Sequence, residues 1–157
     1  MKASDFASHP IEELLPHVRP MLLLDRVTEI TDEHCVCEVT VREDSEFCID
    51  GQVGAWIGVE YMAQTVAALA GAEGLAAGAP VKLGLLLGTR SYESKVPAFA
   101  VGMTLRVQAR RVFFDPQGFG VVDCAIRSHP SGEELAKAAL TVFQVEDLLS
   151  YLQSQPR

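Results

Sequence analysis

Glu60 and Gln64 stand in a stretch, residues 54–74, that is otherwise built almost entirely from apolar and small side chains. At a spacing of four residues, the two side chains lie on the same face of a helix. Residues 51–81 contain no lysine or arginine, so a buried Glu60 would have no local counter-ion and would favour its protonated form. A carboxyl that exchanges protons near neutral pH suits general acid–base catalysis. In the alternative, Glu60 faces a solvent-filled groove or pairs with an arginine of the sheet, for which Arg90 is the candidate.

The start of this helix adds a second chemical element. The sequence DGQVGAW, residues 50–56, places glycines before the first turn, where backbone N–H groups have no partner within the helix. Such groups can polarise a carbonyl oxygen. Glu60 lies one to two turns further on, so a bound carbonyl would hold its neighbouring carbon near the carboxylate, as proton abstraction beside a thioester or ketone requires. Trp56 could form a wall of that pocket or, alternatively, lie in the hydrophobic core.

Strands precede and follow the predicted helix. Two segments rich in branched residues, 21–32 and 34–44, predict an antiparallel pair. After the helix, the turn sequences DPQG and HPSG separate alternating runs and predict a meander. The strands expected there lie at residues 81–96, 102–114, 119–128 and 134–145.

Shorter segments complete the predicted organisation. We expect a short N-terminal helix that ends before Pro16, and a loop at residues 45–54 with Asp50-Gly51 as its turn. One long central helix among about six strands predicts the α+β class, with a curved antiparallel sheet wrapped around the helix. The length of 157 residues fits one domain, residues 1–157.

The charge balance argues against one class of partner and suggests another. The formal net charge of −8 argues against nucleic-acid binding. Residues 1–60 carry 13 acids and 4 bases, whereas residues 82–137 carry 8 bases and 5 acids. The second range could offer a basic surface to an acidic partner, or could carry scattered solvated charges. The candidates for such a surface are Arg90, Lys95, Arg106, Arg110, Arg111 and Arg127.

Composition also bears on location and cofactors. The N-terminal residues lack the apolar core of a secretory signal, so we expect a cytoplasmic protein. Charged residues interrupt the apolar stretch 54–87, so we expect no membrane span. The cysteines are expected as reduced core thiols, with Cys35 and Cys37 on one face of a strand. Without a second ligand pair at zinc spacing, or a nucleotide or flavin motif, we expect no metal and no cofactor.

The predicted architecture has consequences for assembly. A sheet wrapped around one helix leaves edge strands and one helix flank uncovered. Pairing two copies of the chain would cover both, so we expect an obligate dimer.

Three segments resemble a known family: LLPHVRPMLLLDRV, VEYMAQ and GTRSYESKVPAFAVGMTL. They are similar to the hotdog-fold β-hydroxyacyl-acyl-carrier-protein dehydratases, and most similar to the dehydratase-like proteins of aryl-polyene and related polyketide clusters. The similarity runs in order from about Leu14 to Val145. It implies a hotdog fold, a catalytic role for Glu60 and a neighbouring site role for Gln64. It also implies that the family's backbone donor at the helix start falls near Gly54 and Ala55.

The chain departs from this family at one position. The family's second catalytic residue is a histidine in a Gly-His-Phe-Pro loop before the helix, and the matching loop here, SEFCIDGQVGAW, contains no histidine. His17 matches a family position in the N-terminal segment that is not the catalytic one. We expect a structural or tunnel-lining role for His17 beside the substrate.

Three functions follow from these residues and this resemblance. The first is dehydration of β-hydroxyacyl thioesters on acyl carrier protein, with Glu60 as acid and base, in fatty acid or polyene-type synthesis. The second is an acyl thioesterase on the same fold, in which Glu60 activates water. The third is a non-catalytic helper subunit, because an active site shared across the dimer could receive its histidine from a histidine-bearing paralogue. The partner chain is therefore a second copy in a homodimer or that paralogue in a mixed dimer.

Overall fold

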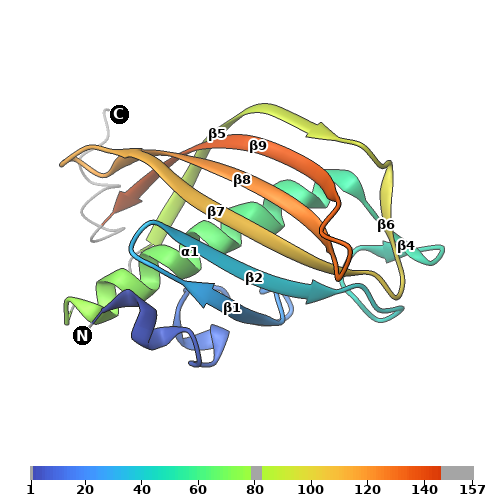
Figure 1. Cartoon of the computed structure of the whole chain (residues 1–157), viewed down its shortest axis with the longest axis horizontal. Helices are drawn as coiled ribbons and strands as arrows, with labels where there is room; N and C mark the ends of the chain where they lie inside the picture. The colour runs from blue at the N-terminus through green and yellow to red at the C-terminus, as the bar shows by residue number, and fades with distance from the viewer. Residues whose placement is uncertain (1, 79–82, 146–157) are drawn as a thin grey trace, which may run out of the picture.

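A six-stranded antiparallel sheet curls around one long helix (Figure 1). The computed structural model describes residues 2–78 and 83–145. Neighbouring strands follow the order β1-β2-β7-β8-β9-β5, so β1 and β5 form the edges. The strands are β1 (Arg26–Ile30), β2 (His34–Thr40), β5 (Leu83–Ser94), β7 (Thr104–Phe114), β8 (Phe119–His129) and β9 (Glu134–Val145). The predicted α+β class and sheet are confirmed. Val81 and Lys82, the first residues of the strand expected at 81–96, lie outside the described residues.

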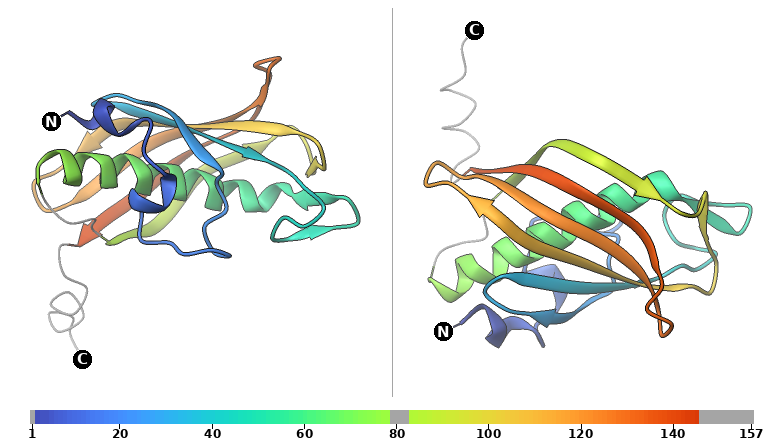
Figure 2. Two further views of the ribbon diagram at one scale, coloured as in Figure 1. Left: turned by 90° about the horizontal axis from the view of Figure 1, so that it is seen from below. Right: turned by 45° about the horizontal axis from the view of Figure 1, so that its top comes forward.

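The helix α1 (Gly58–Ala76) lies along the concave face of this sheet, as the two rotated views show (Figure 2). It begins later than predicted, because a short 3-10 turn, η3 (Ala55–Ile57), precedes it. Most of its side chains are buried, with Met62 and Leu69 in contact with the core. A flank of half-buried residues remains open in the single chain: Val59, Glu60, Ala63, Ala67 and Ala70.

Alternation along the strands separates the core from the outer face of the sheet. On β2, Cys35 and Cys37 are buried while His34 and Glu38 are half exposed. Cys124 on β8 is also buried, and Cys48 is half buried; all four thiols are free. The predicted core position of Cys35 and Cys37 is confirmed.

The N-terminal segment differs from its prediction. Two 3-10 turns, η1 (Ala3–Phe6) and η2 (Ile11–Glu13), replace the expected helix. The first predicted strand begins only at Arg26. Backbone groups of residues 21–24 form hydrogen bonds with side chains instead of a neighbouring strand: two with Gln64 of α1 and two with Arg19. This segment packs so closely on α1 that a Cβ at Gly71 would lie 1.5 Å from the Leu14 carbonyl oxygen.

A second, three-stranded sheet was not predicted. It has the order β3-β4-β6, with β3 (Cys48–Ile49), β4 (Gln52–Gly54) and β6 (Ala98–Ala100). The expected loop is therefore a hairpin, and its turn is the predicted Asp50-Gly51, both with positive φ. Because β4 runs directly into η3, this small sheet fixes where the helix starts (Figure 1).

Among the described residues, no helix is long and apolar enough to cross a bilayer.

Candidate functional site

Glu60 lies in the first turn of α1 and on the open flank of that helix. Its side chain is 41% exposed in the single chain. The carboxylate was expected to be buried, but in the single chain it is not. A surface from outside the described residues has to cover the flank if Glu60 is to be shielded from water.

Gln64 fixes the orientation of that carboxylate. Its amide nitrogen donates to Glu60 Oε1 at 2.9 Å and to the Met21 carbonyl at 2.8 Å. Its amide oxygen accepts from the Leu23 N–H at 2.8 Å. The side chain is completely buried, so both of its donors and its acceptor are used within the protein. Gln64 thus ties the N-terminal segment to α1 and leaves Glu60 Oε2 without a hydrogen-bond partner among the described residues.

The N-terminal segment brings His17 to the same carboxylate. His17 Nε2 lies 3.9 Å from Glu60 Oε1, and the imidazole is 31% exposed. This distance is too long for a direct hydrogen bond, but a single polar atom placed between the two groups could form a hydrogen bond with each of them. Glu60 has no counter-ion close to it in sequence, as expected, and the ionisable neighbour that it has comes from 43 positions earlier in the chain.

The second ring nitrogen of His17 decides which tautomer the site favours. Nδ1 is buried and has no hydrogen-bond partner among the described residues. A proton on Nδ1 would be a buried donor without an acceptor, which costs about 1–3 kcal/mol. The tautomer that carries its proton on Nε2, the nitrogen that faces Glu60, avoids that cost.

The helix start is held by two hydrogen bonds that the sequence did not reveal. The N–H of Ala55 donates to the Pro97 carbonyl at 3.0 Å. The hydroxyl of Tyr92, on β5, donates to the Ala55 carbonyl, and burial raises the pKa of Tyr92. The Ala55 N–H is thus not available to a ligand. Because hydrogen bonding alternates along an antiparallel pair, the N–H of Gly54 points away from β6, to the side of β4 on which β3 lies.

Trp56 is not a core residue. Its side chain is 69% exposed, and its ring meets Phe47 edge-on at a centroid distance of 6.0 Å. The core alternative is therefore wrong, because η3 turns Trp56 outward while Ala55 and Ile57 are buried. Trp56 lies one turn before Glu60, so its proposed place beside a substrate stays a prediction.

The arginines of the sheet do not neutralise Glu60. Arg90 is exposed on β5, and among the described residues no ion pair joins it to Glu60. Arg111 instead donates to Glu73 near the end of α1 and lies over the Phe114 ring. Burial raises the pKa of Glu73, and the neighbouring Arg111 partly offsets that rise. Arg111 therefore does not belong to an exposed basic surface.

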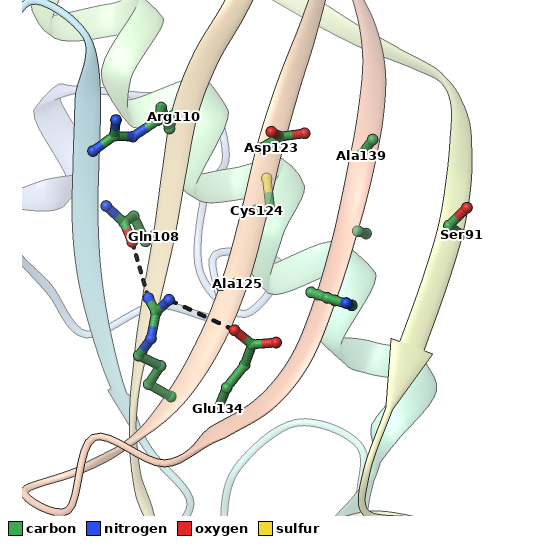
Figure 3. A pocket seen from close by; sticks show the side chains of 11 residues that line it. Ser91, Gln108, Arg110, Asp123, Cys124, Ala125, Glu134 and Ala139 are labelled. Atoms are coloured by element: carbon green, nitrogen blue, oxygen red, sulfur yellow. Dashed lines mark hydrogen bonds and ion pairs between the residues drawn. The ribbon is translucent and has the colours of Figure 1, made fainter.

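A shallow pocket of about 370 Å³ lies on the outer face of the sheet, away from Glu60 (Figure 3). Its floor includes Ala125 and Ala139, and Arg110 and Asp123 stand at its rim. Arg127 is held there between Gln108 at 2.9 Å and Glu134 at 3.7 Å. The helix passes behind the strands in this view. The pocket is therefore separated from Glu60 by the full thickness of the sheet.

The arrangement around Glu60 can exchange one proton at a fixed carboxylate oxygen. Gln64 donates to Oε1, so a proton taken up by the carboxyl is best accommodated on Oε2. Within the part of the chain that the structure describes, no group of three or more potential ligands could hold a metal ion. The contact between His17 and Glu60 has no local sequence signal, and Tyr92 was missed because its partner is a backbone carbonyl.

Comparison with known proteins places this chain among dehydratases. Residues 9–153 match the ApeP-like family, described as ApeP dehydratase. The 3-hydroxyacyl-acyl-carrier-protein dehydratase FabZ of Polynucleobacter asymbioticus is 30% identical over 139 residues, which cover 85% of this chain and 89% of that protein.

Solved structures give the same result. A chain of the dehydratase heterocomplex ApeI:P from Xenorhabdus doucetiae superposes with a TM-score of 0.85 at 32% identity, over 92% of this chain and 95% of that chain. A hypothetical thioesterase of Streptococcus pneumoniae, solved with coenzyme A, has a TM-score of 0.59 at 18% identity, over 76% and 84% of the two chains. The second likeness shows a shared hotdog fold alone.

Proposed function

This chain belongs to the ApeP-like family of hotdog-fold dehydratases, and from that membership we propose that it dehydrates β-hydroxyacyl thioesters carried on acyl carrier protein. Glu60 is the acid–base residue of this reaction. The curated relative with 30% identity is named for the same substrate class, which supports the assignment. The remaining residues proposed around the substrate are Gly54, Ala55, Trp56, Gln64 and His17.

One observation carries this proposal: the carboxylate of Glu60 is oriented by a buried amide and stays open on its other oxygen. An amide that is buried and already bonded to two backbone groups does not rotate away to follow the carboxylate. Glu60 Oε2 is therefore held at one place, where it can accept a proton from the carbon next to a thioester carbonyl. Positioning of this kind is what general acid–base catalysis requires.

The roles of the two residues at the helix start differ in this proposal. Gly54 offers its N–H to the thioester carbonyl, because the N–H of Ala55 is taken by Pro97. Ala55 lines the site and connects the small sheet to the turn that precedes α1. Tyr92 keeps the Ala55 carbonyl in place from the opposite side.

A second chain completes the site. The flank with Glu60 is open, and the edge strand β5 carries Leu86 and Leu87 at 41% and 49% exposure. Pairing along this edge would cover exposed leucines and bring another surface to the flank of α1. The dehydratase heterocomplex that resembles this chain supports a mixed dimer, in which a histidine-bearing paralogue supplies a second acid–base group. A homodimer is the other form, and catalysis then relies on the residues of this chain.

The test uses the purified protein and β-hydroxyacyl groups of graded chain length on acyl carrier protein. We expect enoyl product from the wild type, and a loss of about 10²–10⁴-fold in Glu60→Gln, which keeps the shape but cannot take up a proton. Release of free carrier thiol instead of enoyl product would show a thioesterase. Product that appears only after a histidine-bearing paralogue is added, and that is unaffected by Glu60→Gln, would show a helper subunit and contradict the proposed role of Glu60.

A further inference from the structure

We infer that His17 is a substrate-binding residue that donates a hydrogen bond from Nε2 to the β-hydroxyl, while Glu60 carries out the proton transfers that this chain contributes. This inference rests on the proposed dehydratase function. It assigns to His17 the role of a fixed hydrogen-bond donor rather than that of an acid or base.

The distance between the two residues leaves room for one oxygen atom. His17 Nε2 and Glu60 Oε1 lie 3.9 Å apart, which is too long for a direct hydrogen bond. A hydroxyl oxygen about 2.8 Å from each atom can span that separation. The β-hydroxyl then accepts a hydrogen bond from Nε2–H and donates one to Oε1 while it keeps its proton, so both its acceptor and its donor are used.

The buried face of the imidazole assigns the proton to Nε2. Nδ1 has no partner among the described residues, so a proton placed there would be a buried donor without an acceptor. To act as an acid or a base at Nε2, His17 would need a proton on Nδ1 as well as the one that it exchanges at Nε2, and that Nδ1–H would have no acceptor. The geometry therefore favours a fixed donor over a group that cycles between protonation states.

Arg19, Tyr61 and Tyr92, on the elements around the pair, either have other hydrogen-bond partners or are buried. From the N-terminal segment, Arg19 donates to the carbonyls of Leu22 and Leu24 and pairs with Glu12. From α1, Tyr61 is buried and its pKa is raised to about 12 by burial. From β5, the Tyr92 hydroxyl donates to Ala55. Among the described residues, His17 is the one ionisable group within ion-pair distance of Glu60.

The reaction balances with a single carboxylate. Glu60 Oε2 takes the proton from the carbon next to the thioester carbonyl, and the electrons of that C–H bond form the new double bond. The bond from the next carbon to the hydroxyl breaks, and His17 Nε2–H stabilises the negative charge that develops on the leaving oxygen. The proton held on Oε2 then passes to this oxygen. Water and the enoyl thioester leave, and Glu60 returns to its carboxylate form.

Two substitutions at one position test this role. His17→Gln keeps an N–H donor but cannot titrate, and His17→Leu removes the donor. Loss of one hydrogen bond to developing charge lowers kcat by about 10²–10³-fold. We therefore expect that fall in His17→Leu, partial or full rescue in His17→Gln, and the same shape of pH–rate profile in His17→Gln as in the wild type.

Controls separate this inference from the proposed function. His129→Gln, at the exposed β8–β9 turn, is the matched histidine control and should keep wild-type turnover. Assays use the protein alone or, if it is needed for turnover, the complex with the histidine-bearing paralogue. Equal loss in His17→Gln and His17→Leu with a changed alkaline side of the profile would show an acid–base histidine and overturn the inference. Wild-type turnover in His17→Leu would also overturn it. Retained activity in Glu60→Gln would contradict the proposed function itself.

Discussion

At the scale of single residues, the site depends on a buried amide as much as on the carboxylate. Gln64 satisfies the Leu23 N–H, the Met21 carbonyl and Glu60 with one side chain. An apolar side chain of similar size would leave two partly buried backbone groups without these partners. Gln64 is therefore a structural requirement for the orientation of Glu60.

Gln64→Leu should destabilise the folded chain by about 2–4 kcal/mol, since each unsatisfied buried group costs about 1–3 kcal/mol. For a chain of this size, 1 kcal/mol corresponds to roughly 2–4 °C, so thermal unfolding should occur on the order of 5–15 °C lower. Calorimetry measures this shift. An unchanged Tm would show that the N-terminal segment does not rely on Gln64.

The residue pattern predicted part of the site for a physical reason. Glu60 and Gln64 are four positions apart on a helix, so their contact is local and readable from spacing. The contact of Glu60 with His17 depends on how residues 17–24 fold back onto α1, and no periodicity encodes that path. The exposure of Trp56 was missed because an irregular turn, not the helix, sets its direction.

At the scale of elements, the N-terminal segment and α1 meet backbone to backbone. Gly71 is buried opposite the Leu14 carbonyl, and its φ lies outside the positive range, so space rather than conformation requires glycine here. This contact holds the segment that carries His17 against the helix that carries Glu60.

Gly71→Ala should therefore separate the two elements. A Cβ 1.5 Å from the Leu14 oxygen cannot be accommodated without backbone movement, and overpacking of this kind costs about 1–3 kcal/mol. We expect a lower midpoint of urea unfolding and faster amide exchange of residues 14–24. Stability equal to that of the wild type, with unchanged exchange, would contradict this view of the contact.

The end of α1 is tied to β7 by the pair of Glu73 and Arg111, and this pair gives a pH dependence. Burial raises the pKa of Glu73 above its ordinary value of 4.5, with Arg111 opposing the rise. Because the folded state then binds the proton more readily than the unfolded state, the stabilisation present below pH 4.5 is lost as pH rises through the folded-state pKa.

Compared with Glu73→Gln, the wild type should therefore lose unfolding free energy as pH rises above this range. Urea unfolding of both proteins across a pH series gives the difference. If the wild type instead gains stability over the variant with rising pH, then Arg111 outweighs burial and the pKa shift has the opposite sign.

Regular elements were predictable where burial alternates or repeats, and irregular ones were not. The strand at residues 134–145 was predicted to the residue, because the HPSG turn ends just before it and its apolar side chains alternate from there onward. The small sheet was missed because its strands have two or three residues, too few to show a period. The N-terminal sequence predicts a helix where the structure forms two 3-10 turns of four and three residues.

At the scale of the whole molecule, the sheet divides the charged surface from the site. Arg106, Arg110 and Arg127 alternate with buried residues along β7 and β8 and so lie on the outer face of the sheet. The helix α1, which carries Glu60, lies on the inner face (Figures 1 and 3). Arg106 is paired with Glu38, and Arg127 with Glu134. An acidic carrier protein docked on this face could not deliver its acyl group through a hydrogen-bonded sheet.

Arg110→Glu should therefore leave KM for an acyl-carrier substrate within about twofold of the wild type at low salt, where charge effects are largest. Steady-state kinetics at two salt concentrations measures this. A KM that rises several-fold at low salt and recovers at high salt would place the carrier on the outer face, and with it the basic surface expected from the sequence.

The central claim is that Glu60 exchanges a proton with the carbon next to the thioester carbonyl. The most direct measurement follows hydration of an enoyl-carrier substrate in D₂O, the reverse of the proposed reaction, by mass spectrometry of deuterium at that carbon. We predict incorporation by the wild type, alone or in its mixed dimer, and a loss of about 10²–10⁴-fold in Glu60→Gln. Equal incorporation by both proteins would contradict the account.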